Sequence, residues 1–259
     1  MQSFDRLVDI MARLRGPGGC PWDRAQDHQS LRPYLLEECA EVLDALDAAD
    51  MDALADELGD LLLQIVFHAQ LAAESGAFDL AEVCTRIGDK LIRRHPHVFA
   101  AHAPVDGPEA VVDLWQQIKR EERGGAARSS ALDGTPRALP ALARAQDLQE
   151  RAARVGFDWP DQTGRLAKLA EELAELSAAA ESGDQAAIDE EFGDILIGLV
   201  NAARGLGVDA EASLRAANAK LERRFRACEA LAGGAEAFAQ LDLSAQDALW
   251  DRVKAGERA

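Results

Sequence analysis

The sequence predicts an all-α protein built from two tandem helical-bundle domains. Apolar residues recur at intervals of three and four along most of the chain, and no stretch shows the two-residue alternation of a strand. Hydrophobic residues make up 48% of the chain but aromatic residues only 5%, a composition that favours helices with seams of small and aliphatic side chains. An acidic pattern in the first half recurs 134 residues later, and a length of 259 residues has room for two domains.

Five helices are expected in the first half. They are a helix containing Leu7, Ile10, Met11 and Leu14, one that begins near Ser30 and Pro33, one over 52–74, one from an N-cap at Asp79 to Arg94, and one over 111–122. Gly16-Pro17-Gly18-Gly19 and Gly76 are expected to end the first and third of these helices. The second helix is expected to turn its apolar side inward, namely Leu36, Cys39, Leu43 and Leu46.

The second half repeats this scheme after a segment rich in glycine, serine and proline. Helices are expected near 140–155, 161–181, 184–205, 209–230 and 244–255. The segment 123–140 has the composition of a linker. The expected domains are therefore 1–122 and 141–259, with 123–140 between them.

Paired acidic residues are the feature with the clearest chemical meaning. The first copy consists of Glu37, Glu38, Glu41, Glu57 and Asp60, and the second of Glu171, Glu172, Glu175, Glu191 and Asp194. Spacings of three and four place such residues on one face of a helix, and antiparallel neighbours bring two such faces together. Crowded carboxylates repel one another unless a cation lies between them, and Mg²⁺ prefers oxygen ligands. The duplication favours a metal site over a solvated acidic face.

Basic and aromatic residues of the second half supply what a polyphosphate needs. Lys168 precedes the first acids by one turn, and a later helix carries Asn218, Lys220, Arg223 and Arg224, with Trp250 and Lys254 near the end of the chain. Charged donors beside a carboxylate–metal cluster suit phosphate oxygens, and Trp250 is placed either to stack on a base or to fill a core. Gly59 and Gly193 precede the aspartates in apolar helices, which indicates close approach of a neighbour or plain packing.

Bulk properties exclude several classes of function. A formal net charge of −18 argues against binding to nucleic-acid polymers or anionic lipid surfaces. No segment has the apolar length of a membrane span or a signal peptide, and Cys20, Cys39, Cys84 and Cys228 form no metal-binding or disulfide pattern. A cytoplasmic protein with free thiols is expected.

The chain resembles the MazG family of nucleoside triphosphate pyrophosphohydrolases over nearly its whole length. The matching stretches are Gly19-Cys20-Pro21-Trp22-Asp23, Leu36-Glu37-Glu38 to Leu43-Asp44, Glu57-Leu58-Gly59-Asp60-Leu61-Leu62, Arg93-Arg94-His95-Pro96-His97-Val98-Phe99, Val155-Gly156-Phe157-Asp158-Trp159 and Lys220 to Arg226. The resemblance implies an all-α, usually dimeric enzyme that uses Mg²⁺, with Mn²⁺ as a possible substitute. Such an enzyme splits nucleoside triphosphates, ATP among them, at the α-phosphorus into monophosphate and pyrophosphate, for cleaning or regulating the nucleotide pool.

Residue roles follow from the same resemblance. It implies metal ligation by Glu172, Glu175, Glu191 and Asp194, and it makes Glu171 a further ligand or the residue that orients the attacking water. Glu171 and Glu172 are thus the expected catalytic residues. Contacts with the substrate are implied for Lys168, Glu171, Asn218, Lys220, Arg223, Arg224, Trp250 and Lys254.

The two copies differ on the substrate side. Lys90, Arg93, Arg94, Trp115 and Lys119 parallel residues of the second half, but Tyr34 stands in the place of Lys168 and Gly88 in that of Asn218. Glu37, Glu38, Glu41, Glu57 and Asp60 therefore form a possible second metal site without the full set of substrate contacts. We expect the second half to carry most of the hydrolysis.

Two other interpretations stay open from the residues alone. A di-iron carboxylate bundle would use Glu-x-x-His pairs, but none of the five histidines lies three residues after a glutamate. A non-catalytic helical interaction protein would carry the same acids as a solvated surface. Release of pyrophosphate from a nucleotide in the presence of Mg²⁺ distinguishes the hydrolase from both.

Overall fold

The structure is a computed structural model that describes residues 2–100, 107–122 and 130–257. All regular secondary structure in these ranges is helical, which confirms the all-α class. The chain divides into two compact units, residues 1–126 and 127–259. The domain boundaries expected at 122 and 141 stay a prediction.

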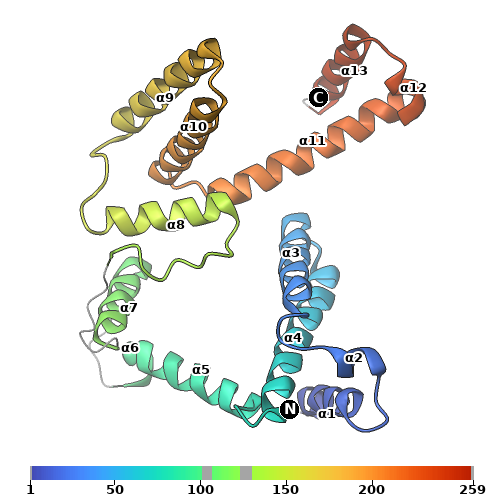
Figure 1. Ribbon diagram of the computed structural model, residues 1–259, viewed down its shortest axis with the longest axis vertical. Coiled ribbons are helices and arrows are strands. Elements are labelled where there is room, and N and C mark those ends of the chain that lie inside the picture. The colour runs from blue at the N-terminus through green and yellow to red at the C-terminus, as the bar shows by residue number, and fades with distance from the viewer. Residues whose placement is uncertain (1, 101–106, 123–129, 258–259) are drawn as a thin grey trace. The chain divides into compact units, whose positions relative to one another are not determined.

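The first unit is organised around a pair of long helices. Its helices are α1 (Gln2–Arg15), α2 (Pro21–Ala25), α3 (Arg32–Ala48), α4 (Met51–Glu74), α5 (Leu80–Arg94), α6 (Pro96–Phe99) and α7 (Pro108–Glu122). Helices α3 and α4 pack along each other, α1 packs on α4, and α7 packs on α5 (Figure 1). The α3–α4 pair holds the first set of acidic residues.

The second unit repeats this plan. Its helices are α8 (Ala141–Ala153), α9 (Gln162–Ser182), α10 (Gln185–Gly205), α11 (Ala210–Ala232), α12 (Ala235–Ala239) and α13 (Leu243–Gly256). Helices α9 and α10 pack along each other and α8 packs on α10, while α12 and α13 pack on α11 (Figure 1). The α9–α10 pair holds the second set of acids.

Aspartate residues cap the N-termini of corresponding helices in the two units. The Asp50 carboxylate accepts hydrogen bonds from the first backbone amides of α4, and Asp184 does the same for α10. Asp79 caps α5, as the sequence predicts. Helix α3 is different, because it begins after Leu31 without a side-chain cap, while Ser30 instead accepts a hydrogen bond from the Asp27 amide.

Three one-turn helices were not expected from the sequence: α2, α6 and α12. Each has only four or five residues, too few for a periodic apolar pattern to be recognised. Pro96 lies in the first turn of α6, where its missing amide hydrogen costs nothing, so the His95-Pro96-His97 turn continues directly into a helix.

A small core joins three parts of the first unit: helix α1, helix α4, and the residue Leu31 just before α3. Met11, Leu31, Val66 and Phe67 are each at most 3% exposed and form one cluster. The Arg15 guanidinium lies 5.4 Å from the centre of the Phe67 ring and forms two hydrogen bonds with the Glu74 carboxylate. This core fixes the end of α4 that lies away from its acidic residues.

The expectation that α3 buries Leu36, Cys39, Leu43 and Leu46 is wrong for the single chain. Leu36 is 64% exposed and Leu46 is 50% exposed, and Leu43 and Cys39 are exposed as well. The α3–α4 pair is only two helices thick, so one chain cannot cover both sides of each helix. Among the helices in the described ranges, none has the length and apolarity needed to cross a lipid bilayer.

Candidate active site

The second acidic cluster lies between α9 and α10. Gly183 and Asp184 form the short turn between the two helices, and Gly183 adopts a positive φ of 71°, which glycine adopts without strain. The turn makes the helices antiparallel neighbours, so the face bearing Glu172 and Glu175 meets the face bearing Glu191. The sequence spacing thus becomes a three-dimensional cluster.

Three carboxylates of this cluster lie close enough to share one cation. One oxygen each from Glu172, Glu175 and Glu191 lies within 4.8 Å of the others. Glu172 is only 6% exposed, and its buried Oε2 atom has no hydrogen-bond partner among the residues that the structure describes. A buried acceptor without a partner is costly, so this oxygen is suited to a ligand.

Asp194 and Glu171 lie at the border of the cluster. Asp194 is exposed and lies outside the group of three, but its charge is among those that raise the pKa of Glu191. The Glu171 carboxylate is 57% exposed and also lies outside the group of three. The structure thus brings three of the four expected metal ligands together directly and places Asp194 nearby.

The electrostatics of the cluster favour a positive ligand. Burial raises the pKa of Glu191 above its ordinary value, and the neighbouring charges of Glu175, Glu172 and Asp194 raise it further. A raised pKa means that the folded chain disfavours the ionised carboxylate. A cation held between these oxygens would remove that penalty.

Lys168 is the basic residue that the structure does place at the cluster. Its Nζ atom lies 2.8 Å from Glu171 Oε1 and 2.8 Å from Glu172 Oε1. Hydrogen bonds from the ammonium group to Glu171 and Glu172 raise the pKa of Lys168, so this side chain stays charged. The Lys168 side chain is 40% exposed, so it can also reach outward.

The first cluster has the same geometry in the α3–α4 pair. One oxygen each from Glu38, Glu41 and Glu57 lies within 4.8 Å of the others. Burial raises the pKa of Glu38, and the Asp60 and Glu41 charges raise it further; the pKa of Glu57 is raised in the same way. Glu37 and Asp60 are exposed and lie outside the group of three.

Gln64 is a buried polar residue at the first cluster that sequence reasoning missed. It lies on α4, is 6% exposed, and its Nε2 atom donates a 3.4 Å hydrogen bond to Glu38 Oε1. Within the described ranges, its buried Oε1 atom has no hydrogen-bond partner. The sequence feature that could have revealed Gln64 is its place as a single glutamine among apolar residues in the middle of a helix. The corresponding position of the second copy is Gly198.

The arginines expected to contact substrate are held together by a second missed residue, Glu257. Arg223 Nη2 lies 3.1 Å and Arg224 Nη2 2.6 Å from the Glu257 carboxylate, and the Arg224 guanidinium lies 5.8 Å from the centre of the Trp250 ring. In the described part of the chain, no hydrogen bond or ion pair joins this group to the acids of α9 and α10. The group fastens α13 to α11.

The first unit repeats this arrangement. Arg93 and Arg94 each lie 2.6 Å from the Glu122 carboxylate, and their hydrogen bonds lower the pKa of Glu122 to about 2. Glu122 and Glu257 are 135 residues apart, as are Trp115 and Trp250, so the repeat itself could have revealed both glutamates.

The remaining residues expected to contact substrate are not brought to the acidic cluster. Asn218 and Lys220 are exposed on α11, and Lys254 forms an ion pair of 3.1 Å with Asp251 on its own helix. The Lys119 side chain lies outside the described part of the structure. Among the described residues, no atom outside the glycine's chain neighbours and its own helix backbone lies within 4 Å of the place of a Cβ at Gly59 or Gly193, so neither the close neighbour nor the tight packing suggested by the sequence is found at these glycines.

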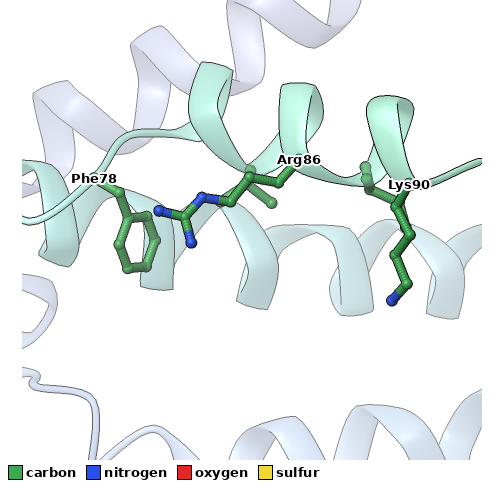
Figure 2. A pocket seen from close by; sticks show the side chains of 5 residues that line it. Phe78, Arg86 and Lys90 are labelled. Atoms are coloured by element: carbon green, nitrogen blue, oxygen red, sulfur yellow. The ribbon is translucent and has the colours of Figure 1, made fainter. Parts of the chain in front are cut away.

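A pocket in the first unit is separate from both clusters. It is lined by side chains of α5 and by Phe78, which lies two residues before α5 begins; the α5 residues are Val83, Arg86, Ile87 and Lys90. Figure 2 shows Arg86 extending along the helix toward the Phe78 ring, with Lys90 a turn further on. Arg86 forms an ion pair with Glu82, and no acid of the α3–α4 cluster lines the pocket.

The donor set fits a hard divalent cation. Both clusters consist of carboxylate oxygens, and neither contains a histidine. His28 and His68 instead contact each other, with 2.8 Å between their Nδ1 atoms. The unpartnered Glu172 oxygen and the raised pKa of Glu191 both suit a positively charged ligand.

Comparison with known proteins agrees with this geometry. Residues 26–99 and 162–228 each match the model of the MazG nucleotide pyrophosphohydrolase domain, and each match contains one acidic cluster. The chain is 49% identical over 262 residues to the nucleoside triphosphate pyrophosphohydrolase of Escherichia coli K12, with 99% of each chain covered. It is 44% identical to the nucleoside triphosphate pyrophosphohydrolase/pyrophosphatase MazG of Thermotoga maritima, with 98% of this chain and 96% of that protein covered. The chain belongs to the MazG nucleotide pyrophosphohydrolase family.

Proposed function

We propose that the protein is a Mg²⁺-dependent hydrolase that converts nucleoside triphosphates, ATP among them, into nucleoside monophosphate and pyrophosphate. The observation that carries the proposal is the Glu172–Glu175–Glu191 cluster, with its unpartnered buried oxygen and with Lys168 beside it. Full-length similarity to named nucleoside triphosphate pyrophosphohydrolases supports the same reaction. Mg²⁺ is favoured because every donor is a carboxylate oxygen, and Mn²⁺ would accept the same ligands.

The side chains divide the work of the reaction. Glu172, Glu175 and Glu191, with Asp194 at the border, would hold the cation, which polarises phosphate oxygens and makes a bound water more acidic. Glu171 is exposed beside them and would orient the attacking water and accept its proton. Lys168 would bind phosphate oxygens and counter the charge that develops on the leaving pyrophosphate.

The outer substrate contacts are part of the proposal. Arg223, Arg224 and Trp250 already form one group on α11 and α13, with a planar aromatic surface for a base and guanidinium groups for phosphates. We assign three further residues to the part of the substrate that this group contacts: Asn218, Lys220 and Lys254. In the absence of nucleotide, the Glu257 carboxylate keeps the two arginines in place.

Isotopic labelling tests the reaction and its site of attack. The chain is incubated with a panel of ribo- and deoxynucleoside triphosphates in ¹⁸O-water, with and without Mg²⁺, and the products are analysed by mass spectrometry. Attack at the α-phosphorus places ¹⁸O in the monophosphate, whereas attack at the β-phosphorus places it in pyrophosphate. Label in pyrophosphate, or release of single phosphates, would contradict the proposal.

A homodimer is the proposed assembly, because the exposed apolar surface needs a cover. Leu166 and Leu173 are each 51% exposed two turns apart on α9, and Phe192 is 55% exposed on α10. An exposed apolar stripe of this kind indicates an interface between chains. A second copy is the simplest partner, since both units present the same kind of stripe, with Leu36 and Leu43 on α3.

Leu173→Asp is expected to shift the protein from dimer to monomer, because the substitution places a charge in the proposed apolar interface. Sedimentation velocity at several concentrations measures the change. Thr163→Asp, on the exposed start of the same helix, is the matched control and should leave the assembly intact. A wild-type chain that sediments as a monomer at all concentrations would contradict the dimer.

Added Mg²⁺ or Mn²⁺ is expected to raise the melting temperature more at pH 8 than at pH 5. The raised pKa of Glu38 in the first cluster means that the folded chain binds protons more strongly than the unfolded chain, so without cation the stability of the fold falls as pH rises through this pKa. A bound cation favours the ionised carboxylate and therefore stabilises the fold at pH values above that pKa. At lower pH, protons compete for the carboxylate oxygens and displace the cation. Thermal unfolding followed by circular dichroism measures both effects. A cation effect that is equal at both pH values, or matched by NaCl of the same ionic strength, would contradict the site.

The physiological role proposed is cleaning or regulation of the nucleotide pool in the cytoplasm. The four cysteines are free, as expected for a reducing compartment. The first cluster is assigned a weaker, regulatory or structural part, because Tyr34 replaces Lys168 and its ring packs edge-to-face on Trp22.

A further inference from the structure

The two acidic clusters differ in the group that neutralises them. In the second cluster, the Lys168 ammonium lies 2.8 Å from Glu172 Oε1 and so places a positive charge at the edge of the cation site. In the first cluster, no ammonium or guanidinium group of the described residues lies within ion-pair distance of Glu38, Glu41 or Glu57. Tyr34, at the position of Lys168, is turned toward Trp22.

The first cluster has a neutral amide in place of that charge. Gln64 is 94% buried, its Nε2 atom faces Glu38 Oε1 at 3.4 Å, and its Oε1 atom has no partner. The two ends of an amide group have nearly the same shape, so a half-turn of this group presents an oxygen where the nitrogen now lies. A carboxamide oxygen is a suitable fourth ligand for a divalent cation.

The second cluster cannot form this ligand. Gly198 stands at the position of Gln64, and a Cβ there would lie 3.3 Å from Leu169 Cδ1, so the space belongs to an apolar side chain. Glu172 is 94% buried and its Oε2 atom lacks a partner, while its Oε1 atom is engaged by Lys168. This cluster therefore has one ligand fewer and one competing cation more than the first.

We propose that the two clusters bind the divalent cation under different conditions: the first binds it alone, with Gln64 as a ligand, and the second binds it together with the polyphosphate. An ammonium group next to a carboxylate repels an incoming dication and competes for the same oxygen. A triphosphate offers Lys168 other anionic oxygens, and the partly exposed side chain can turn to them. Glu172 then has both oxygens free for the cation.

Lys168 thereby couples substrate binding to cation binding at the reacting site. Without nucleotide, the lysine holds the carboxylates together and keeps the second site from retaining a cation. With nucleotide, the same side chain moves to phosphate as the cation enters. This inference rests on the proposed function for its ligand, a nucleoside triphosphate, but its first half concerns the cation alone.

Counting bound Mn²⁺ by electron paramagnetic resonance tests the proposal on the full chain at pH 8. Wild type is expected to retain one tightly bound Mn²⁺ per chain without nucleotide, and two with a triphosphate analogue whose α,β-bridge is a methylene group. Lys168→Met is expected to retain two without nucleotide, whereas Lys168→Arg keeps the wild-type count of one. Glu38→Gln is expected to remove the nucleotide-independent Mn²⁺, and Gln64→Leu to weaken it at least about tenfold through loss of a ligand.

Several outcomes would overturn the proposal. The first is that wild type without nucleotide binds two Mn²⁺ with equal affinity. The second is that Lys168→Met without nucleotide retains only one Mn²⁺. The third is that wild type binds no additional Mn²⁺ when the analogue is present. Helical content by circular dichroism shows that each variant is folded, so that a lost ion reports the site. Failure of the proposed function is recognised separately, because wild type would then release no monophosphate from any nucleoside triphosphate, whatever its Mn²⁺ count.

Discussion

Glu172→Ala is expected to lower pyrophosphate release by at least about 100-fold, because even groups that only support a metal ligand change activity by about 10–100-fold. Glu172 is the most buried acid of the second cluster. One oxygen of its carboxylate forms an ion pair with Lys168, and the other has no hydrogen-bond partner among the described residues. Its removal takes away a ligand and also one of the two carboxylates that hold Lys168. Initial rates at saturating and at low substrate measure the loss in kcat and in kcat/KM.

Glu38→Ala is the matched variant, because Glu38 occupies the same position in the first cluster. It is expected to reduce activity much less than Glu172→Ala, since the first cluster has no lysine to bind phosphate. A greater loss from Glu38→Ala would reverse the assignment of the two units. Equal losses would mean that both clusters hydrolyse substrate.

Asp158→Asn is expected to lower the free energy of unfolding by about 2 kcal/mol, between the values for exposed and buried ion pairs, because the Asp158 side chain is 25% exposed. Asp158 accepts hydrogen bonds of 3.0 Å from Arg165 on α9 and is also bonded to Arg204 near the end of α10. The side chains of Arg165 and Arg204 are 9% and 13% exposed, so the substitution leaves two largely covered guanidinium groups beside a neutral amide in place of a carboxylate.

The effect of Asp158 has a defined pH dependence. Hydrogen bonds from Arg204 and then Arg165 lower the pKa of Asp158 to about 2, against an ordinary value of 3.8. A lowered pKa stabilises the fold above the ordinary value, and this stabilisation is lost as pH falls from about 4 toward 2. The variant should therefore differ most from wild type at neutral pH and converge with it in acid.

Denaturant unfolding followed by circular dichroism measures this difference. Asp251→Asn is the control, because the Asp251 side chain is 67% exposed in its pair with Lys254. Its cost should be within about 0.5 kcal/mol. A cost for Asp158→Asn no larger than that of the control would show that the Asp158 network does not hold α9 and α10 in place.

The long helices could be predicted because their apolar residues recur over many turns. The expected range 184–205 for α10 is within one residue of the observed Gln185–Gly205. Burial could not be predicted in the same way, because periodicity gives the apolar side of a helix but not whether one chain covers it. Leu36 has the expected place on α3 and is nevertheless exposed.

The candidate site was predictable where the repeat marks it. Glu172, Glu175 and Glu191 meet because two spacings on adjacent helices converge, and both copies show the same spacings. Gln64 and Asp158 were missed because each is a single polar residue whose partner comes from another helix or from a distant part of the chain. Glu257 was missed although its counterpart Glu122 occurs at the same offset as the paired tryptophans.

The central claim, that the α9–α10 acids hold a divalent cation for nucleotide hydrolysis, is tested most directly by anomalous diffraction. Crystals grown with Mn²⁺ and the α,β-methylene triphosphate analogue are measured near the manganese absorption edge. We expect an anomalous peak within ligand distance of Glu172, Glu175 and Glu191, with the phosphates beside Lys168. A crystal containing bound analogue but no manganese peak among these three carboxylates would contradict the account.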